Sequence, residues 1–241
     1  MNATALFYVT HGSSDRRSWL VLQDLLVTAR SRIGHLFPSI GGGCLEGQEL
    51  SLAKQLELFA LEVANSSGTE IVILPLFLLE GVHVKEDIPE QVATVTSAAL
   101  LKAGQQDSIK FRVTKHLGTS PQIPQLLSQS FVRQSPDCQN RILIAHGSRR
   151  DGANQVVEDL AQQCQAIAAY WGIEPKIETQ IEALLSQGIT EIALLPYFLT
   201  EGGITEAIAK KLQTYSDRAR IKQLAVPLSK SQIIDLSLEF V

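Results

Sequence analysis

The stretch TEIVILPLFLLEG at residues 69–81 returns without a gap as TEIALLPYFLTEG at residues 190–202. A second pair of segments repeats in the same order: LFYVTHGS at residues 6–13 corresponds to ILIAHGS at residues 142–148. Two matched pairs in one order indicate an internal repeat, and each copy is expected to fold as one structural unit. The repeat therefore decides the architecture: the chain is two versions of one plan.

Each half alternates apolar runs with segments of helical periodicity. In the first half the expected strands are residues 6–10, 42–45, 71–79 and 111–116. Apolar strands that alternate with helices predict a parallel four-stranded sheet flanked by helices on both faces. The fold class is thus α/β, with two repeated domains at residues 1–134 and 140–241. Ligands of such sheets bind beyond the carboxyl ends of the strands, so we expect the active-site cleft between the two domains.

The composition excludes several classes of protein. The 241 residues include 21 basic and 25 acidic side chains, a net charge of −4, so no overall positive field favours nucleic acid. The longest apolar run, residues 71–79, is far shorter than the roughly 20 residues of a membrane-spanning helix, and the N-terminus has no basic leader. Cys44, Cys138 and Cys164 are far apart and odd in number, which fits reduced thiols. We therefore expect a cytoplasmic protein that binds neither nucleic acid nor membranes.

Two histidines follow predicted strands and are candidate metal ligands. His11 ends the first strand, and His83 follows the third strand in the segment LLEGVHVKED. Both lie past strand ends of one sheet, so their neutral imidazoles can converge on a divalent ion such as Fe²⁺, Co²⁺ or Ni²⁺. Glu46 follows the second predicted strand and could add a carboxylate. The alternative is that each histidine caps a turn and that Glu46 is a solvated charge at a helix start.

Other residues of these types are expected to have no chemical role. The glycine run at residues 41–43 lacks the lysine and the spacing of a phosphate-binding loop, so we expect a flexible lead-in to the second strand and no nucleotide site. His35 follows a predicted helix, where its charge suits the helix dipole. His116 ends the fourth predicted strand, and we expect it to serve packing or capping.

Basic and hydroxyl side chains gather around the repeated motifs. A helix N-terminus with arginines beside it can bind carboxylates or phosphates, and surface charge exposed to solvent is the simpler alternative. The candidate substrate-binding residues are Ser13, Ser14, Arg16, Arg17 and Lys85 in the first half, with His146, Ser148, Arg149 and Arg150 in the second.

Three segments together resemble the sirohydrochlorin chelatase family in its two-domain form. They are the His-Gly-Ser turn at residues 11–13, the Cys-Leu-Glu segment at residues 44–46, and PLFLLEGVHVKEDIP at residues 75–89. The resemblance covers nearly the whole chain, and the third segment is its most specific part. It implies chelatase-type domains and a lyase-type metal chelatase that inserts Co²⁺ or Fe²⁺ into sirohydrochlorin, in cobalamin or sirohaem biosynthesis. It also implies no nucleotide and no cofactor beyond the substrate metal.

The resemblance assigns roles to the candidate residues. It implies that His11 and His83 bind the incoming metal and help to remove the pyrrole protons, with Glu46 as a third catalytic residue. The substrate is rich in carboxylates, which gives the basic side chains around the motifs a purpose despite the net acidic chain.

The second half departs from this pattern. In the ungapped alignment Ile204 stands where the first half has His83. The His-Gly-Ser motif recurs after 135 positions, but the segment around Pro75 recurs after 121, so the second half lacks 14 residues between these two motifs. We expect the loss around the second strand, where nothing matches residues 44–46. The metal site is therefore expected in the first half, with the second half as the opposite wall of the cleft.

Two other functions stay open at this point. Phosphoryl transfer through a phosphohistidine, as in the phosphoglycerate mutase family, requires an arginine before His-Gly, whereas Thr10 and Ala145 stand there. A non-enzymatic carrier of metal or tetrapyrrole would use the same ligands without turnover. The sequence leaves the choice between Co²⁺ and Fe²⁺ open, because both accept imidazole and carboxylate. It also leaves the oligomeric state open, although the internal repeat lets a monomer supply both walls of the cleft.

Overall fold

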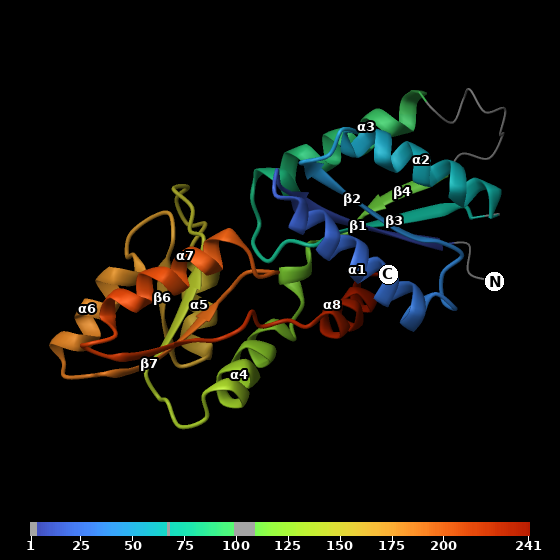
Figure 1. Ribbon diagram of the computed structural model, residues 1–241. Coiled ribbons are helices and arrows are strands. Elements are labelled where there is room, and N and C mark those ends of the chain that lie inside the picture. Colours follow the sequence, from blue (N-terminus) through green and yellow to red (C-terminus); the bar gives the residue numbers. More distant parts are fainter. Residues whose placement is uncertain (1–3, 67, 99–108) are drawn as a thin grey trace. The chain divides into compact units, whose positions relative to one another are not determined.

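The structure is a computed structural model that describes residues 4–66, 68–98 and 109–241 (Figure 1). The chain divides into two compact units: unit 1 comprises Met1–Ser120 and Lys230–Val241, and unit 2 comprises Pro121–Ser229. Each unit is built on one sheet of four parallel strands, which confirms the predicted α/β class with two repeated domains. In the described part of the chain, no helix has both the length and the apolar character needed to cross a membrane.

The sheet of unit 1 has the strand order β2-β1-β3-β4. Its strands are β1 (Thr4–Gly12), β2 (Ile40–Glu46), β3 (Glu70–Pro75) and β4 (Lys110–Val113). Its helices are α1 (Arg16–Ile33), α2 (Leu52–Asn65), α3 (Ile88–Ala98) and α8 (Lys230–Ser237), with a π-helical turn η1 (His83–Asp87) and 3₁₀ turns η3 (Leu117–Thr119) and η5 (Leu238–Phe240). Residues 5–9 and 71–74 are buried, because helices cover both faces of the two central strands.

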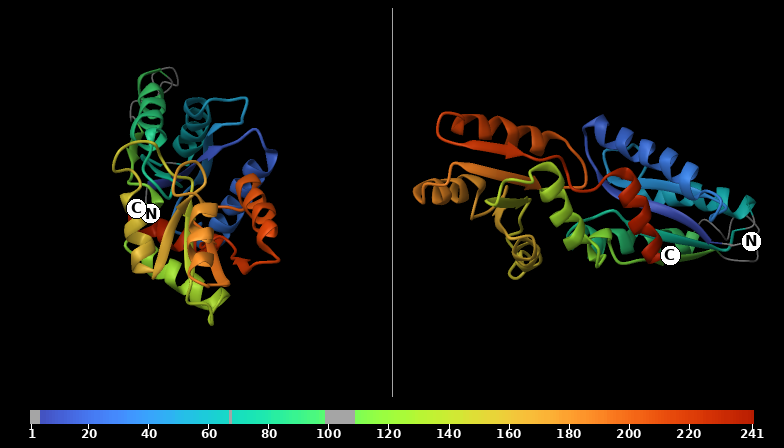
Figure 2. Two further views of the ribbon diagram at one scale, coloured as in Figure 1. Left: turned by 90° about the vertical axis from the view of Figure 1, so that its left-hand side faces the viewer. Right: turned by 90° about the horizontal axis from the view of Figure 1, so that it is seen from below.

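The two faces of this sheet are packed by different helices. Successive residues of β1 point to opposite faces. Phe7 joins the core formed with α2 and α3, and its ring lies 5.0 Å from that of Phe59. Tyr8 points to the other face, where its hydroxyl lies 2.8 Å from the hydroxyl of Ser237 in α8. The last helix of the chain therefore completes the core of unit 1, and it lies beside α1 (Figures 1 and 2).

The glycine run of the second strand is structural. The prediction of a flexible lead-in is wrong, because residues 41–43 lie within β2 and pair with β1. A Cβ on Gly41 would lie 2.6 Å from the Phe59 ring, and one on Gly43 would lie 2.6 Å from the Gln55 side chain. Glycine thus lets α2 pack closely on the strand that ends in Glu46.

Unit 2 repeats the plan with the strand order β6-β5-β7-β8. Its strands are β5 (Arg141–Ala145), β6 (Ala166–Tyr170), β7 (Glu191–Pro196) and β8 (Arg220–Gln223). Its helices are α4 (Ile123–Gln134), α5 (Gln155–Gln163), α6 (Ile177–Ser186) and α7 (Gly203–Leu212), followed by the 3₁₀ turn η4 (Gln213–Tyr215). Ile144, Leu194 and Ile208 lie at the centre of a buried cluster that joins the sheet to α6 and α7.

The compact units differ from the sequence repeats in one helix each. Helix α4 falls within the first repeat, residues 1–134, but packs in unit 2, where the Arg141 guanidinium lies 5.3 Å from the Phe131 ring centre. Helix α8 falls within the second repeat, residues 140–241, but packs in unit 1, where Asp235 forms a 2.7 Å ion pair with Arg32. The order of elements along the chain does not reveal which sheet a terminal helix covers.

Candidate functional site

His11 is presented by the carboxyl end of β1. The next residue, Gly12, has a φ of +80°, and a Cβ there would lie 2.0 Å from the Glu46 carbonyl oxygen, so the turn requires glycine. The exposed imidazole of His11 places its Nδ1 atom 2.9 Å from the Gly12 carbonyl oxygen. A carbonyl only accepts, so we assign the ring proton to Nδ1. The Nε2 atom then keeps the lone pair that metal binding needs.

His83 is presented by the π-helical turn η1, which follows the loop after β3. Its Nε2 atom lies 3.0 Å from the Nε2 atom of His11. The ring centres are 4.5 Å apart and the ring planes are at 83°. The predicted convergence of the two histidines is therefore observed, although 72 residues separate them in the chain.

The separation of the two nitrogens matches a shared metal ion. Two imidazole nitrogens bound at about 2.1 Å from one ion, at right angles, would lie about 3.0 Å apart. Right angles are those of neighbouring positions in octahedral coordination. Among the described residues, no group of three or more His, Cys, Asp or Glu side chains is arranged to hold a metal ion. The site on the protein is thus a pair of imidazoles with room for other ligands.

Asp87 was not expected from the sequence to belong to the site. Its Oδ2 atom lies 2.6 Å from His83 Nδ1, on the side of the ring away from His11. The spacing of four residues along a helical segment could have indicated this contact. The His83 ring therefore has a carboxylate behind it on the side opposite His11, an arrangement common behind metal-bound imidazoles.

Glu46 is the last residue of β2 and is exposed. It is the ladder partner of Gly12, the residue after His11. The strand pairing therefore brings its backbone to the edge of the sheet that carries His11. Its carboxylate forms no three-ligand cluster with the two histidines, as the described residues contain none.

Several of the candidate substrate-binding side chains already have partners. Arg17 forms a 2.7 Å ion pair with Asp15, the residue that caps α1, and its hydrogen bonds lower the pKa of the Asp15 carboxyl. Lys85 lies 3.0 Å from Glu80. The Ser13 hydroxyl accepts a hydrogen bond from the backbone of Asp15.

The remaining candidates are also at the surface. Within the described residues, three of the candidate arginines are exposed and have no ion-pair partner, and Ser14 is exposed in the same turn as the first of them. The three are Arg16 in unit 1 and Arg149 and Arg150 in unit 2. The Ser148 hydroxyl accepts a hydrogen bond from the backbone of Arg150.

His146 occupies the position of His11 in unit 2. Its Nδ1 atom lies 3.1 Å from the Gly147 carbonyl oxygen, and Gly147 has a φ of +82°. The strand register continues past β6, because the Gly172 amide donates to the His146 carbonyl. Gly172 therefore stands where unit 1 has Glu46.

The missing residues lie around the second strand, as the sequence suggested, although the strand itself is present in unit 2. The residue that pairs with the end of the first strand comes 34 positions later in unit 1 (Thr10 with Cys44) but 25 positions later in unit 2 (Ala145 with Tyr170). Nine of the 14 missing residues therefore precede β6, where α5 has 9 residues against 18 in α1. Unit 2 therefore has a second strand but no counterpart of the Glu46 carboxylate.

His116 packs beneath the loop that leads to His83. The predicted fourth strand ends earlier than expected, at Val113, and His116 precedes the turn η3. Its Nδ1 atom lies 3.0 Å from the Phe77 carbonyl oxygen, and burial lowers the pKa of the imidazole. The expected packing role is confirmed. His35 is exposed after α1, as its predicted role requires.

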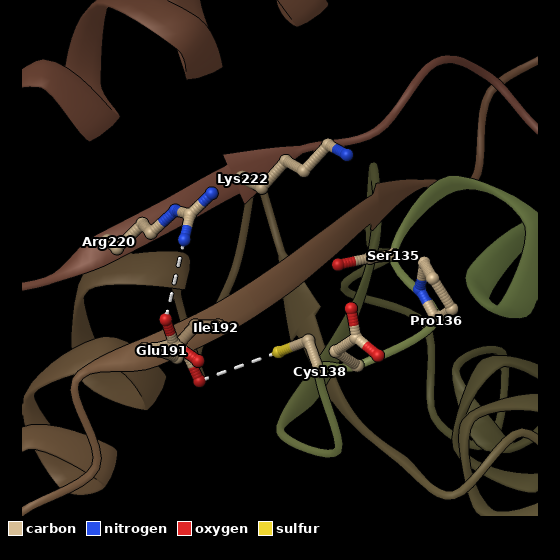
Figure 3. Close-up of a pocket in the computed structure, with 8 residues that line it drawn as sticks. Ser135, Pro136, Cys138, Glu191, Ile192, Arg220 and Lys222 are labelled. Carbon is tan, nitrogen blue, oxygen red and sulfur yellow. Dashed lines mark hydrogen bonds and ion pairs between the residues drawn. The ribbon is translucent and has the colours of Figure 1, made fainter.

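A hollow elsewhere in unit 2 offers a different surface. It has a volume of about 150 Å³ and lies at the amino ends of β7 and β8, away from the His-Gly-Ser turn (Figure 3). Its polar groups face one another: Glu191 lies 3.6 Å from Arg220, and the Cys138 thiol donates to the Glu191 carbonyl. Lys222 donates to a backbone carbonyl at Gln134. Most of these polar groups are therefore paired with one another, and the lining does not define a ligand.

Known proteins share both the sequence pattern and the fold. The family model described as CbiX matches residues 5–134 and 140–235. The sirohydrochlorin ferrochelatase of Bacillus subtilis (strain 168) is 24% identical over 220 residues, which are 87% of this chain and 79% of that protein.

Two solved structures have a similar fold. SirB from Bacillus subtilis with Fe³⁺ has a TM-score of 0.79, and the sirohydrochlorin chelatase SirB from Bacillus subtilis subspecies spizizenii, in complex with cobalt, has a TM-score of 0.70. Each is 21% identical, and each match covers 100% of this chain and 94% of the other. The family model spans both repeats and each of the motifs that carry the histidines. This chain therefore belongs to the CbiX family.

Proposed function

We propose that this protein inserts a divalent metal ion into sirohydrochlorin as a lyase-type chelatase. The observation that carries the proposal is the pair of imidazole Nε2 atoms, 3.0 Å apart, one at the carboxyl end of β1 and one in the π-helical turn after β3. Family membership supports it, and the relative from Bacillus subtilis is named a sirohydrochlorin ferrochelatase. Sirohaem or cobalamin biosynthesis would be the use of the product, according to whether iron or cobalt is inserted.

A pair of imidazoles suits an ion that must be passed on. A structural metal site surrounds its ion with four protein ligands and keeps it. His11 and His83 would fill two positions and leave the others to water, which the nitrogens of the macrocycle can replace one at a time. The metal is the substrate in this scheme, and no nucleotide or further cofactor takes part.

Insertion also requires that two pyrrole N–H protons leave the macrocycle. As the ion moves from the protein to the macrocycle, the Nε2 atoms of His11 and His83 regain free lone pairs and can accept protons. We assign Glu46 as a further ligand or proton acceptor, since it is exposed and is the ladder partner of the residue after His11. Its role is expected to be smaller than that of either histidine.

The carboxylates of the substrate would meet the basic side chains around the two His-Gly-Ser turns. Arginine is well suited to them, because its guanidinium can bind a carboxylate with two parallel hydrogen bonds. The assigned groups are Ser13, Ser14, Arg16, Arg17 and Lys85, with His146, Ser148, Arg149 and Arg150. Of these, the arginines without an ion-pair partner in the described structure are the most available.

The expected setting is reducing. All three cysteines are free thiols, and burial raises the pKa of Cys44 and Cys164, so these two are poorly reactive. Free thiols suit the cytoplasm, which would also keep iron as Fe²⁺. We propose that the protein acts there as a monomer, since one chain carries both repeats.

The deciding experiment is anaerobic incubation of the purified protein with sirohydrochlorin and either Co²⁺ or Fe²⁺. The absorption spectrum of the macrocycle reports formation of the metallated product. An enzyme should form many products per protein molecule, faster than metal and macrocycle react alone. A carrier would bind metal or macrocycle in a fixed ratio and leave the rate of metallation unchanged, which would refute the proposal.

A further inference from the structure

The turn that carries His83 contains an extra residue compared with unit 2. The buried residue Ile88 follows Pro75 by 13 positions, whereas its counterpart Ile208 follows Pro196 by 12. Beyond these isoleucines the buried positions have the same spacing in both units. Val92 and Val95 are buried in unit 1, and Leu212 and Tyr215 are buried at the corresponding positions of unit 2. One residue is therefore inserted between Gly81 and Ile88.

The structure accommodates this insertion as a π-helical turn. The Ile88 amide donates to the carbonyl of His83, five residues earlier, as a π-helix requires. In unit 2 the corresponding segment is ordinary α-helix from Gly203, with no histidine or aspartate among residues 203–207. The π turn thus occurs in the unit that has the imidazole pair, and single π turns are frequent at functional sites.

The turn places Asp87 directly behind His83. The two side chains are 37% and 40% exposed, and Oδ2 lies 2.6 Å from Nδ1. A carboxylate accepts here and the ring nitrogen donates, so the Nδ1 proton is fixed on the side away from His11.

The turn itself does not depend on this contact. Ile88 is fully buried and anchors the start of α3, and its amide closes the π turn through backbone atoms alone. The Lys85 amide donates to the Gly81 carbonyl, four residues earlier, which is also a backbone contact. Removal of the Asp87 carboxylate should therefore leave the turn in place and free the His83 ring to rotate.

We infer that Asp87 is a positioning residue for metal capture: it holds His83 in the orientation and tautomer that aim Nε2 at the ion shared with His11. This inference rests on the proposed function of the site, since it gives the two histidines the role of metal ligands. Partners of this kind contribute roughly 10- to 100-fold to metal affinity.

The test is titration of the metal-free protein with Co²⁺ under anaerobic conditions, followed by the cobalt absorption bands. Asp87→Ala should weaken binding at least about tenfold. Asp87→Asn keeps an oxygen that can accept from Nδ1 and should recover part of the loss. The matched control is Glu86→Gln, which removes the same charge from the neighbouring residue of the turn and should bind like the wild type.

A double-mutant cycle separates positioning from a structural role. In a His83→Ala background, Asp87→Ala should cause no further loss of Co²⁺ affinity, because it acts through the missing ring. Wild-type affinity in Asp87→Ala, or an equal loss with and without His83, would overturn the inference. Because Co²⁺ binding is measured without the macrocycle, failure of the wild type to metallate sirohydrochlorin would refute the proposed function and leave this test intact.

Discussion

Each unit has its own sheet of the same topology and its own His-Gly turn. The units differ in the group that faces the histidine of that turn. In both, the imidazole Nδ1 lies about 3 Å from the carbonyl of a glycine with φ near +80°. In unit 1 a second imidazole meets it, whereas in unit 2 the segment after β7 is regular helix without histidine. The same fold therefore carries a pair of facing imidazoles in one copy and a single imidazole in the other. One inserted residue and two side chains make the difference.

The largest effect is expected from breaking the pair itself. His11→Ala or His83→Ala should each lower the rate of metallation at least about a hundredfold, because each removes a ligand and a proton acceptor. Neither side chain belongs to the buried core, so the circular dichroism spectrum and melting temperature should change little. His35→Ala, an exposed histidine elsewhere in unit 1, is the control. A near-normal rate in either site variant would remove the basis of the proposed mechanism.

The next test converts the turn of unit 1 into that of unit 2. Deletion of Glu86 leaves five residues between Gly81 and Ile88, as unit 2 has between its equivalents, and should replace the π turn with α-helix. His83 would then rotate away from His11, and Co²⁺ affinity should fall at least about tenfold.

The control for this deletion is Glu86→Ala, which keeps the length of the turn and should bind Co²⁺ normally. The buried residues of α3 keep their spacing in the deletion variant, so its melting temperature should stay close to that of the wild type. Unchanged Co²⁺ affinity would show that the extra residue does not serve the histidine pair. Unfolding would show that it is needed for packing.

A smaller effect is expected from the histidine that has no partner. His146→Ala should change the KM for sirohydrochlorin only a few-fold and leave kcat nearly unchanged, since uniform binding contributes to KM. Co²⁺ should bind at one ion per chain before and after the change. Arg149→Ala and Arg150→Ala should raise KM in the same way, because both are exposed and unpaired within the described residues. A second ion per chain, or a loss as deep as that of His11→Ala, would show that unit 2 is itself a working metal site.

The differences between units also mark the limit of prediction from sequence. The repeat, the parallel sheets and the convergence of His11 and His83 follow from apolar runs and from the rule that strand ends share an edge. The inserted residue was not visible in the sequence. The two repeats align without a gap up to Gly81, and the offset of one residue shows only when the buried positions of α3 and α7 are compared. Asp87 was missed for the same reason: its role depends on the geometry of the turn.

Tertiary packing was the other hidden part. Whether α4 and α8 cover one sheet or the other depends on contacts such as that of Tyr8 with Ser237, which no local pattern encodes. The glycines of β2 were misread because their purpose is the close approach of Phe59, a residue 18 positions beyond Gly41. Local periodicity identified the elements, and long-range contacts decided their arrangement.

The smallest expected effect concerns the support beneath the site. His116 in unit 1 corresponds to Val226 in unit 2. Each stands three residues after an equivalent ladder residue of the fourth strand, Val113 in β4 and Gln223 in β8. In unit 2 the Val226 amide donates to the Glu201 carboxylate, and the side chain at this position is apolar. His116→Val therefore gives unit 1 the residue of unit 2.

The variant should make folding less sensitive to acid. Burial lowers the pKa of His116, so the folded protein binds fewer protons than the unfolded chain as the pH falls through the ordinary histidine range. The wild type thus loses stability from about pH 7 towards pH 5, with a slope from this residue of at most about 1.4 kcal/mol per pH unit. Urea unfolding of His116→Val across that interval should show a shallower loss than the wild type. An unchanged slope in His116→Val would mean that the imidazole is protonated in place, and that burial beneath the loop of His83 does not keep it neutral.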